Sequence, residues 1–360
     1  MKKNKFIYIL ITLFIISIIS IYSFSKFINN YSTDLVLKQI IFYIIGIILI
    51  LIIRKINLKT IIKYSFTIYI INTLLLLLLL IFGKEINGSK AWFTIPLLGA
   101  FQPSEFMKIS LILFLSKILD KNKDKKDYIK IFKVFIVILI PSILTFLEPD
   151  TGAVIIYFII GISLLYFANI NNKWFISFII IVIVILSSVI YIYNYNSSLF
   201  LKILGNNIFY RLERIFSFYK SSGYQLGNSL VSIGSAGFFG NGSNNILLYF
   251  PEGHTDFIFT SFFSIFGLFG SIFLIFILLY LDINIIDLSI KEKEYTLKYI
   301  LISIVSTIIY QQIQNISMTI GLLPITGITL PFISYGGSSL ISYCILLGIV
   351  DNIYNKRPNY

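Results

Sequence analysis

Three short motifs contain the ionisable residues that ordinary loop charge does not explain. The first is Gln102-Pro-Ser-Glu-Phe-Met-Lys108, the second is Glu148-Pro-Asp-Thr-Gly152, and the third is Pro251-Glu-Gly-His-Thr-Asp-Phe257. Each of them borders a long apolar run. Because ionisable groups beside hydrocarbon are costly, carboxylates and a lysine at such positions predict acid-base or anion-binding chemistry.

The first two motifs also have purely structural explanations. Pro103 and Ser104 suit the start of a helix, Glu105 complements its positive end, and Lys108 lies three residues further on the same face. The functional alternative is that a lysine one turn inside an apolar span needs an anionic partner. In the second motif, Asp150 either caps the helix that follows or contributes to a site.

The third motif contains the strongest candidate for a general base, Asp256. It directly precedes residues 257–281, which carry no charge. The alternative is a helix cap worth about 1 kcal/mol. A helix N-terminus lowers the pKa of a carboxyl group, whereas apolar neighbours and Glu252 raise it, and the sequence leaves this balance open. His254 is the only histidine, which excludes a multi-histidine metal site and favours a hydrogen-bonding role.

Two further segments are irregular and rich in glycine. Residues 223–242 follow Arg211 and Arg214, so glycine amides and guanidinium groups there could bind a phosphate, although tight packing of a loop also explains the glycines. Residues 321–339 combine helix breakers with an absence of charge. Broken backbone at membrane depth must line a cavity or be buried in protein.

The composition excludes a water-soluble fold. Of the 360 residues 57% are hydrophobic and only 12% are charged, and the mean hydropathy is +0.90, whereas soluble domains are about 25% charged. The net charge of +13 lies mostly between the apolar blocks, which indicates membrane orientation and not nucleic-acid binding. The single cysteine, Cys344, excludes an internal disulfide and a cysteine metal cluster.

The apolar blocks predict an all-α polytopic membrane protein with about ten transmembrane helices, because a span needs about 20 apolar residues. We expect one membrane domain over residues 1–360, with a large extracytoplasmic loop, residues 194–255, between the seventh and eighth helices. The expected spans are 6–25, 39–53, 61–82, 104–119, 131–147, 153–168, 174–193, 256–281, 296–320 and 333–354.

Most of the 29 Lys and Arg residues fall on one of the two alternating sides, which the positive-inside rule places in the cytoplasm. An even number of spans then puts both termini in the cytoplasm of a bacterial inner membrane. The densest basic run, residues 120–127, becomes a cytoplasmic loop. The irregular segments 83–101 and 194–255 lie on the opposite face, together with the three motifs.

In their order and spacing, these motifs resemble those of the SEDS family, the shape, elongation, division and sporulation proteins that polymerise peptidoglycan glycan strands from lipid II. The resemblance covers roughly residues 85 to 350. Residues 318–321 and 326–332 are more similar to the elongation protein RodA than to the division protein FtsW. The segments that carry it are Gln102-Pro-Ser-Glu105, Pro149-Asp150, Gly223-Tyr-Gln225, Ile233-Gly-Ser235, Pro251-Glu252, His254-Thr-Asp-Phe-Ile-Phe259, Gly321-Leu-Leu-Pro324 and Pro331-Phe-Ile-Ser-Tyr-Gly-Gly-Ser-Ser339.

The resemblance implies ten helices, an extracytoplasmic active site and Asp256 as the catalytic residue. It implies lipid II as substrate, a class B penicillin-binding protein as transpeptidase partner, and membrane proteins of the elongation complex as further partners. The chain departs from the family at Ala91, where the family usually has Arg, and at Glu148, where it usually has Gln. Residues 261–266 also lack the acidic pair common after the aspartate motif, and Asn241 stands where many relatives have Lys. The candidates for binding sugar or diphosphate are Trp92, Glu105, Lys108, Asp150, Arg211, Arg214, Gln225, Glu252 and His254.

The expected reaction is a glycosyl transfer in which Asp256 takes the proton from the acceptor 4-hydroxyl group. Lys108, Arg211 or Arg214 would stabilise the departing diphosphate, with a divalent cation, Mg²⁺ or Mn²⁺, as a candidate cofactor whose ligands the sequence does not identify. One alternative is a lipid II flippase, which would also need functional groups on the cytoplasmic side. Another is a non-catalytic scaffold for a transpeptidase, which would not need Asp256.

Overall fold

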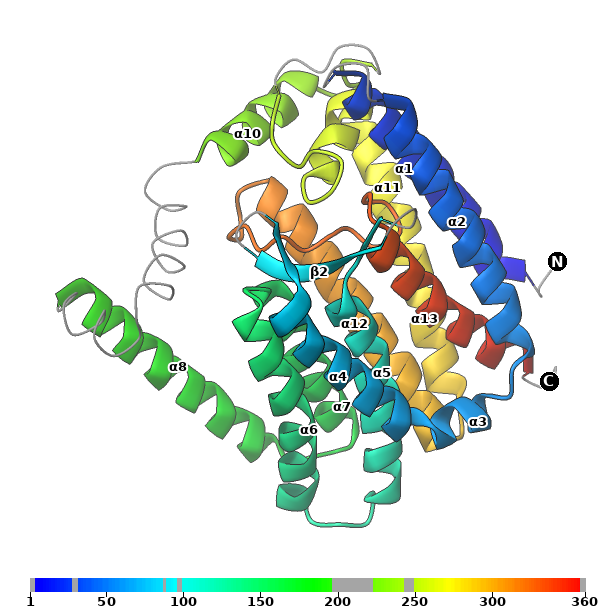
Figure 1. The fold of residues 1–360 in the computed structure, drawn as a ribbon, viewed down its shortest axis with the longest axis vertical. Coiled ribbons are helices and arrows are strands. Elements are labelled where there is room, and N and C mark those ends of the chain that lie inside the picture. Colours follow the sequence, from blue (N-terminus) through cyan, green and yellow to red (C-terminus); the bar gives the residue numbers. More distant parts are fainter. Residues whose placement is uncertain are drawn as a thin grey trace.

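A computed structural model describes residues 4–27, 32–86, 89–95, 99–195, 223–242 and 249–356. The apolar blocks form helices that pack into one bundle (Figure 1). Each of the ten expected spans coincides with a helix or a broken pair of helices. The helices are α1 (Lys5–Phe27), α2 (Ser32–Lys55), α3 (Leu58–Lys63), α4 (Ser65–Phe82), α5 (Pro103–Lys121), α6 (Asp127–Leu147), α7 (Thr151–Phe167), α8 (Asn172–Tyr195), α10 (Tyr224–Ala236), α11 (Ile258–Lys291), α12 (Tyr295–Thr319) and α13 (Gly337–Lys356).

Among the described residues, eight helices are long and apolar enough to cross a membrane, and α7 is a shorter apolar helix. α5 carries Glu105, Lys108 and Lys117 among its apolar residues. It nevertheless packs between α4, α7 and α12, and the side chain of Lys108 is fully buried there. The polytopic helical class is confirmed, while the count of ten spans stays a prediction.

Several boundaries differ from the expected ones. The third expected span is broken at Tyr64, which ends α3 and precedes α4. The eighth runs ten residues further than expected, to Lys291, because residues after 281 continue to alternate apolar and polar side chains on a helical face. The last helix begins at Gly337 and not at 333, because residues 322–336 form an irregular segment of turns.

A small antiparallel sheet adds to the all-α expectation. Its strands are β1 (Lys84–Ile86), β2 (Ser89–Ile95) and β3 (Gly99–Phe101), in the order β1-β2-β3. Phe93 lies opposite Phe101 in the β2–β3 pair. The run Trp92-Phe-Thr-Ile95 has the aromatic and β-branched residues that favour strands. The sheet covers the start of α5 and contacts α13.

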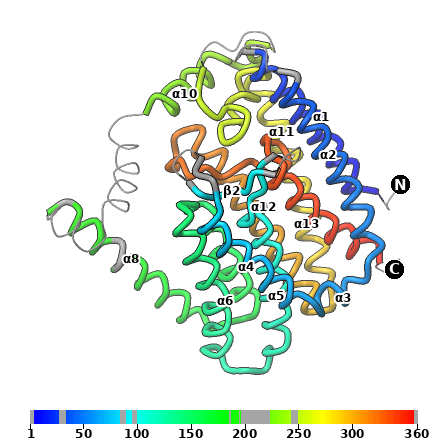
Figure 2. Tube along the Cα trace, viewed as in Figure 1, coloured from blue at the N-terminus to red at the C-terminus, as the bar shows by residue number. Residues whose placement is uncertain are grey.

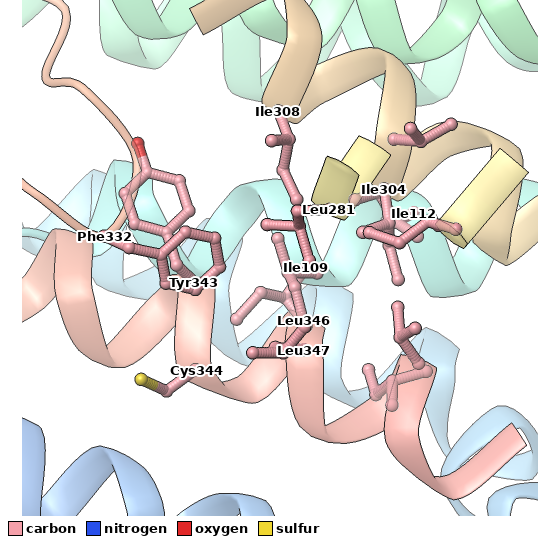
Figure 3. Packing of buried hydrophobic residues seen from close by; sticks show 14 of the residues in the cluster. Ile109, Ile112, Leu281, Ile304, Ile308, Phe332, Tyr343, Cys344, Leu346 and Leu347 are labelled. Atoms are coloured by element: carbon pink, nitrogen blue, oxygen red, sulfur yellow. The ribbon is translucent and has the colours of Figure 1, made fainter. Parts of the chain in front are cut away.

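The core lies where α5, α11, α12 and α13 meet. Figure 3 shows Ile109 and Ile112 of α5, Leu281 of α11 and Ile308 of α12 facing Leu346 of α13. α13 packs along α2. α8 stands apart from the bundle in both views (Figures 1 and 2), and none of its described side chains is buried.

α11 is broken one quarter of the way along by Gly267, whose backbone lies at φ 64° and ψ −160°. Residues 237–242 insert at this break and bond to the backbone that it exposes. The Leu268 amide donates to the Gly237 carbonyl at 3.0 Å, and the Asn241 amide donates to the Ser264 carbonyl at 2.8 Å. A break at membrane depth is thereby compensated by protein hydrogen bonds.

Candidate active site

Four chain segments meet at one end of the bundle, namely the starts of α5, α7 and α13 and the turn before α11. The backbone amide of Gln102 donates to Ser338 Oγ at 2.9 Å, which joins the start of α5 to the start of α13. Gln102 Nε2 donates to Asp150 Oδ2 at 2.9 Å, which joins α5 to α7. The first two motifs of the sequence are therefore adjacent in space.

The turn that contains Asp256 is tightly hydrogen-bonded. The Phe257 amide donates to the Glu252 carbonyl at 2.9 Å, and Thr255 Oγ1 donates to Glu252 Oε2 at 2.6 Å. Ser334 Oγ donates to the Thr255 carbonyl at 2.7 Å, which attaches the turn to the irregular segment before α13. These bonds hold the backbone on both sides of Asp256.

Asp256 does not cap α11. The N-cap residue is Phe257, and no side chain accepts a capping hydrogen bond there. The capping alternative for Asp256 is therefore wrong, because the turn places this residue one position too early. Its carboxylate instead faces Gly327, where an added Cβ atom would lie 3.6 Å from Asp256 Oδ2.

The sequence leaves open whether the pKa of Asp256 is lowered or raised, and the surroundings of its carboxyl group in the structure decide this. Burial, the main cause, together with the neighbouring charges of Glu252 and Asp150 raises the pKa of Asp256 to about 7. A carboxylate with a pKa near the working pH is well suited to take a proton in a reaction.

Asn315 of α12 links the backbone of Asp256 to the irregular segment, residues 322–336. Its side-chain amide donates to the Asp256 carbonyl and to the Ile328 carbonyl, both at 2.8 Å. Asn315 is fully buried. Sequence reasoning missed this residue, and the available signal was a polar amide inside an apolar span.

Asp150 has both of the roles that the sequence suggests. Its Oδ1 accepts from the Ala153 amide at 3.1 Å, so it caps α7. Its Oδ2 accepts from Gln102 Nε2 and from Ser104 Oγ, each at 2.9 Å. Burial raises the pKa of Asp150, and these hydrogen bonds lower it by a smaller amount. The capping and site explanations are therefore compatible.

Glu105 and Lys108 form an ion pair inside the bundle, at 2.6 Å between Lys108 Nζ and Glu105 Oε2. The lysine side chain is fully buried, and its ammonium group lies 4.7 Å from the centroid of the Tyr343 ring. Ser342 Oγ donates to Glu105 Oε2 at 2.9 Å. Lys108 thus has an anionic partner within the protein, as a buried charge requires.

Glu148 adds a buried carboxyl group that was not among the site candidates. It is the C-cap residue that follows α6, and it is fully buried. Burial, the main cause, together with the charge of Asp150 raises its pKa to about 8. At neutral pH this carboxyl group is mostly protonated, so it resembles the neutral glutamine that the family usually has at this position.

The other candidates differ in how the structure places them. Gln225 Nε2 donates to the Pro251 carbonyl at 2.9 Å, which ties α10 to the turn of Asp256. The His254 ring stacks on Phe24, with 6.1 Å between ring centroids, and burial lowers its pKa. Its Nδ1 has no hydrogen-bond partner among the described residues, so the hydrogen-bonding role expected of this side chain stays a prediction. Trp92 pairs with Lys84 across the sheet.

Arg211 and Arg214 lie outside the described residues. Within the residues that are described, no group of three or more His, Cys, Asp or Glu side chains could hold a metal ion by itself. The described site therefore combines several carboxyl groups with one basic residue, Lys108, that is already paired.

Comparison with known proteins gives one consistent result. The family model described as "Cell cycle protein", which covers FtsW, RodA and SpoVE, matches residues 3–359. A probable peptidoglycan glycosyltransferase FtsW of Buchnera aphidicola is 32% identical over 330 residues, which cover 87% of this chain and 89% of that protein. The corresponding protein of Wigglesworthia glossinidia is 33% identical over 361 residues, which cover 95% and 91%.

Solved structures show the same fold. A chain from a peptidoglycan synthase complex that coordinates polymerization and crosslinking aligns with a TM-score of 0.83, at 21% identity over 98% of this chain and 97% of that one. The rod shape determining protein RodA of Thermus thermophilus aligns with a TM-score of 0.72, at 21% identity over 99% and 98%.

Proposed function

The chain belongs to the SEDS family of FtsW, RodA and SpoVE cell cycle proteins, and we infer on this basis that it is a peptidoglycan glycosyltransferase. Curated relatives above 30% identity that carry this activity in their names support the inference. The observation that carries the mechanism is the position of Asp256. Its carboxyl group has a pKa of about 7, and a hydrogen-bonded turn holds its backbone.

In the proposed reaction, Asp256 removes the proton from the 4-hydroxyl group of the acceptor sugar. The hydroxyl oxygen then bonds to the anomeric carbon of a lipid-linked donor, and the bond from that carbon to the diphosphate breaks. The diphosphate leaves with the bonding electron pair, and the proton stays on Asp256. A single displacement inverts the anomeric centre, and one base is sufficient for it. Lipid II is the proposed donor.

The departing diphosphate needs positive charge to stabilise it, and the described part of the site contains one basic residue. Lys108 is paired with Glu105, so we assign the main role to Arg211 and Arg214. A divalent cation would fit if substrate oxygens completed its ligand set, because Mg²⁺ is commonly held by one or two carboxylates and phosphates. Glu252 and Asp150 are the candidate ligands, and the cation would neutralise diphosphate charge. Loss of activity with a chelator and recovery with Mg²⁺ or Mn²⁺ would test this.

The test of the enzyme compares the wild-type chain with Asp256→Asn in polymerisation of labelled lipid II. Both proteins are purified with a class B penicillin-binding protein. Asp287→Asn is the matched control, because Asp287 is exposed and, within the described part of the chain, its ion pair is with Lys291 of the same helix. We expect polymer from the wild type and the control and none from Asp256→Asn. Equal polymer from all three would remove Asp256 from the mechanism. No polymer from the wild type would favour a flippase or a scaffold.

We propose that the chain lies in a bacterial inner membrane with both termini in the cytoplasm. The basic loop between α5 and α6 then faces the cytoplasm and Asp256 faces outward. Lys125→Cys tests this orientation, because the native Cys344 is buried and should not react. A membrane-impermeant maleimide should label Lys125→Cys in inverted vesicles and not in intact cells. The opposite pattern would reverse the topology.

A transpeptidase partner and a role in elongation are the remaining proposals. The similar chain of known structure belongs to a complex that couples polymerization to crosslinking, which supports a class B penicillin-binding protein as partner. Co-purification of the two proteins from one membrane extract tests the pairing. Rescue of rod shape in RodA-depleted cells, set against rescue of division in FtsW-depleted cells, tests the role in elongation.

A further inference from the structure

A hollow lies between α5 and α6, far from the active site. Its volume is about 290 Å³. The active-site residues lie at the start of α5 and this hollow at its end, which is about 27 Å away at 1.5 Å per helical residue. The lining residues are Ile118, Lys121, Asn122, Phe132, Lys133, Ile136 and Val137.

One side of the hollow is apolar and is exposed on the surface of the helix bundle. Phe132 and Ile136 lie one helical turn apart on α6, and they are 63% and 40% exposed. Ile118 and Val137 close the inner side and are partly buried. α6 is apolar and long enough to span a membrane, so we expect an exposed apolar hollow on it to face acyl chains.

The rim of the hollow is basic. Lys121 ends α5, and Lys133 lies on the second turn of α6. Lys133 Nζ donates to Asn122 Oδ1 at 2.7 Å, and this hydrogen bond holds the ammonium group at the opening of the hollow. Among the described residues, no acidic side chain lines the hollow. The nearby Asp120 accepts a hydrogen bond from Thr296 Oγ1 of α12 at 2.5 Å, so its charge is engaged by another helix.

We propose that this hollow binds an anionic glycerophospholipid of the surrounding leaflet. Its phosphate would lie against the ammonium groups of Lys121 and Lys133, and the start of one acyl chain would lie on Phe132 and Ile136. Basic pockets between transmembrane helices on the cytoplasmic side suit anionic head groups. The volume is at the lower limit of the roughly 300 to 1,000 Å³ typical of small-molecule sites, which suits part of a lipid.

The experiment is native mass spectrometry of the detergent-purified full chain with equal amounts of phosphatidylglycerol and phosphatidylcholine of the same acyl chains. We expect phosphatidylglycerol to be retained preferentially. The double variant Lys121→Gln with Lys133→Gln should lower that retention roughly tenfold or more, since each lysine near the head group contributes to attraction of anionic lipid. Equal retention of the two lipids by the wild type would overturn the proposal.

Two further variants separate a site from general loop charge. Lys125→Gln with Lys126→Gln removes the same charge from exposed positions of the same loop and should retain the lipid. Ile136→Trp fills the hollow without changing charge and should displace the lipid. An equal loss in both lysine pairs, or full retention in Ile136→Trp, would contradict the site. Because the readout is bound lipid, a failure here is distinguishable from a failure of the proposed glycosyl transfer.

Discussion

The side-chain amide of Asn315, which lies 59 residues after Asp256 in the sequence, donates a hydrogen bond to the backbone carbonyl of Asp256 at 2.8 Å. The same amide donates to Ile328. One buried group therefore sets the position of the proposed base relative to the irregular segment before α13. Its role is one of positioning, because it contacts backbone and not the reacting atoms.

Asn315→Leu should keep the volume of the side chain and remove the donor. Two buried carbonyls then lose a partner, at about 1–3 kcal/mol for each unsatisfied group. We expect a lower melting temperature and a fall in kcat that is larger than the change in KM. Thermal unfolding and lipid II polymerisation at several substrate concentrations measure both. A variant with normal kcat would show that Asp256 does not depend on this amide.

The rate of polymerisation should rise with pH through about 7, because a base acts only when it is ionised and the pKa of Asp256 is raised to about 7. Glu252→Gln removes one of the charges that raise this pKa. The acid limb of its pH–rate profile should therefore move to lower pH. A limb that stayed in place in Glu252→Gln would assign the titration to a different group.

Glu148→Gln should retain activity at pH 7, because the native carboxyl group is then mostly protonated. The pKa of Glu148 is raised from 4.5 to about 8. Between these values the folded chain holds a proton that the unfolded chain releases, so its stability falls as pH rises across this window. The stability of Glu148→Gln should not fall in this way, because glutamine has no carboxyl group to ionise.

The comparison of melting temperatures of the wild type and Glu148→Gln at pH 5.5 and 7.5 tests the sign. The advantage of the variant should grow with pH, by at most about 1.4 kcal/mol for each pH unit. A constant difference between the two proteins would mean that Glu148 is ionised throughout.

Lys108→Met should destabilise the chain by about 3–5 kcal/mol, because it leaves the carboxylate of Glu105 in the bundle without its cation. The double variant Glu105→Gln with Lys108→Met should regain most of that stability. A double-mutant cycle based on unfolding in detergent measures the coupling. Additive effects of the two substitutions would show that the pair contributes nothing as a pair.

Much of this arrangement could be predicted from residue type and spacing. Pro103 begins α5, Asp150 caps α7, and Lys108 pairs with Glu105, because each effect depends on residues within one helical turn. The family predicted from the motifs is confirmed. Local rules of this kind need no knowledge of how distant segments pack.

The remaining features depend on contacts between distant segments. Asn315 bonds to Asp256 across the bundle, and the pKa of Asp256 depends on burial that no local pattern reports. The break in α11 at Gly267 depends on insertion of residues 237–242, so a charge-free run gave no sign of it. Whether Trp92 serves the site also stays a prediction.

Gly267→Ala should destabilise the chain by more than about 1 kcal/mol, because its φ of 64° is unfavourable for a side chain. A Cβ atom there would also lie less than 3.0 Å from the Gly240 backbone. Gly234→Ala is the matched control, since an added Cβ atom meets nothing within 4 Å and lies inside α10. The control should be neutral or slightly stabilising. Equal melting temperatures for both variants would refute the strain at Gly267.

The contact between Gly240 and Gly267 also restricts how the chain can change during evolution. A side chain at either position would clash with the backbone of the other segment. A second substitution at the other glycine would not relieve that clash, because the obstacle is backbone. The neighbouring Leu268 and Phe269 are exposed, so exchanges among Ile, Leu and Phe should cost little there. Gly240, which follows α10, and Gly267, inside α11, are therefore constrained together by one close approach of two backbone segments.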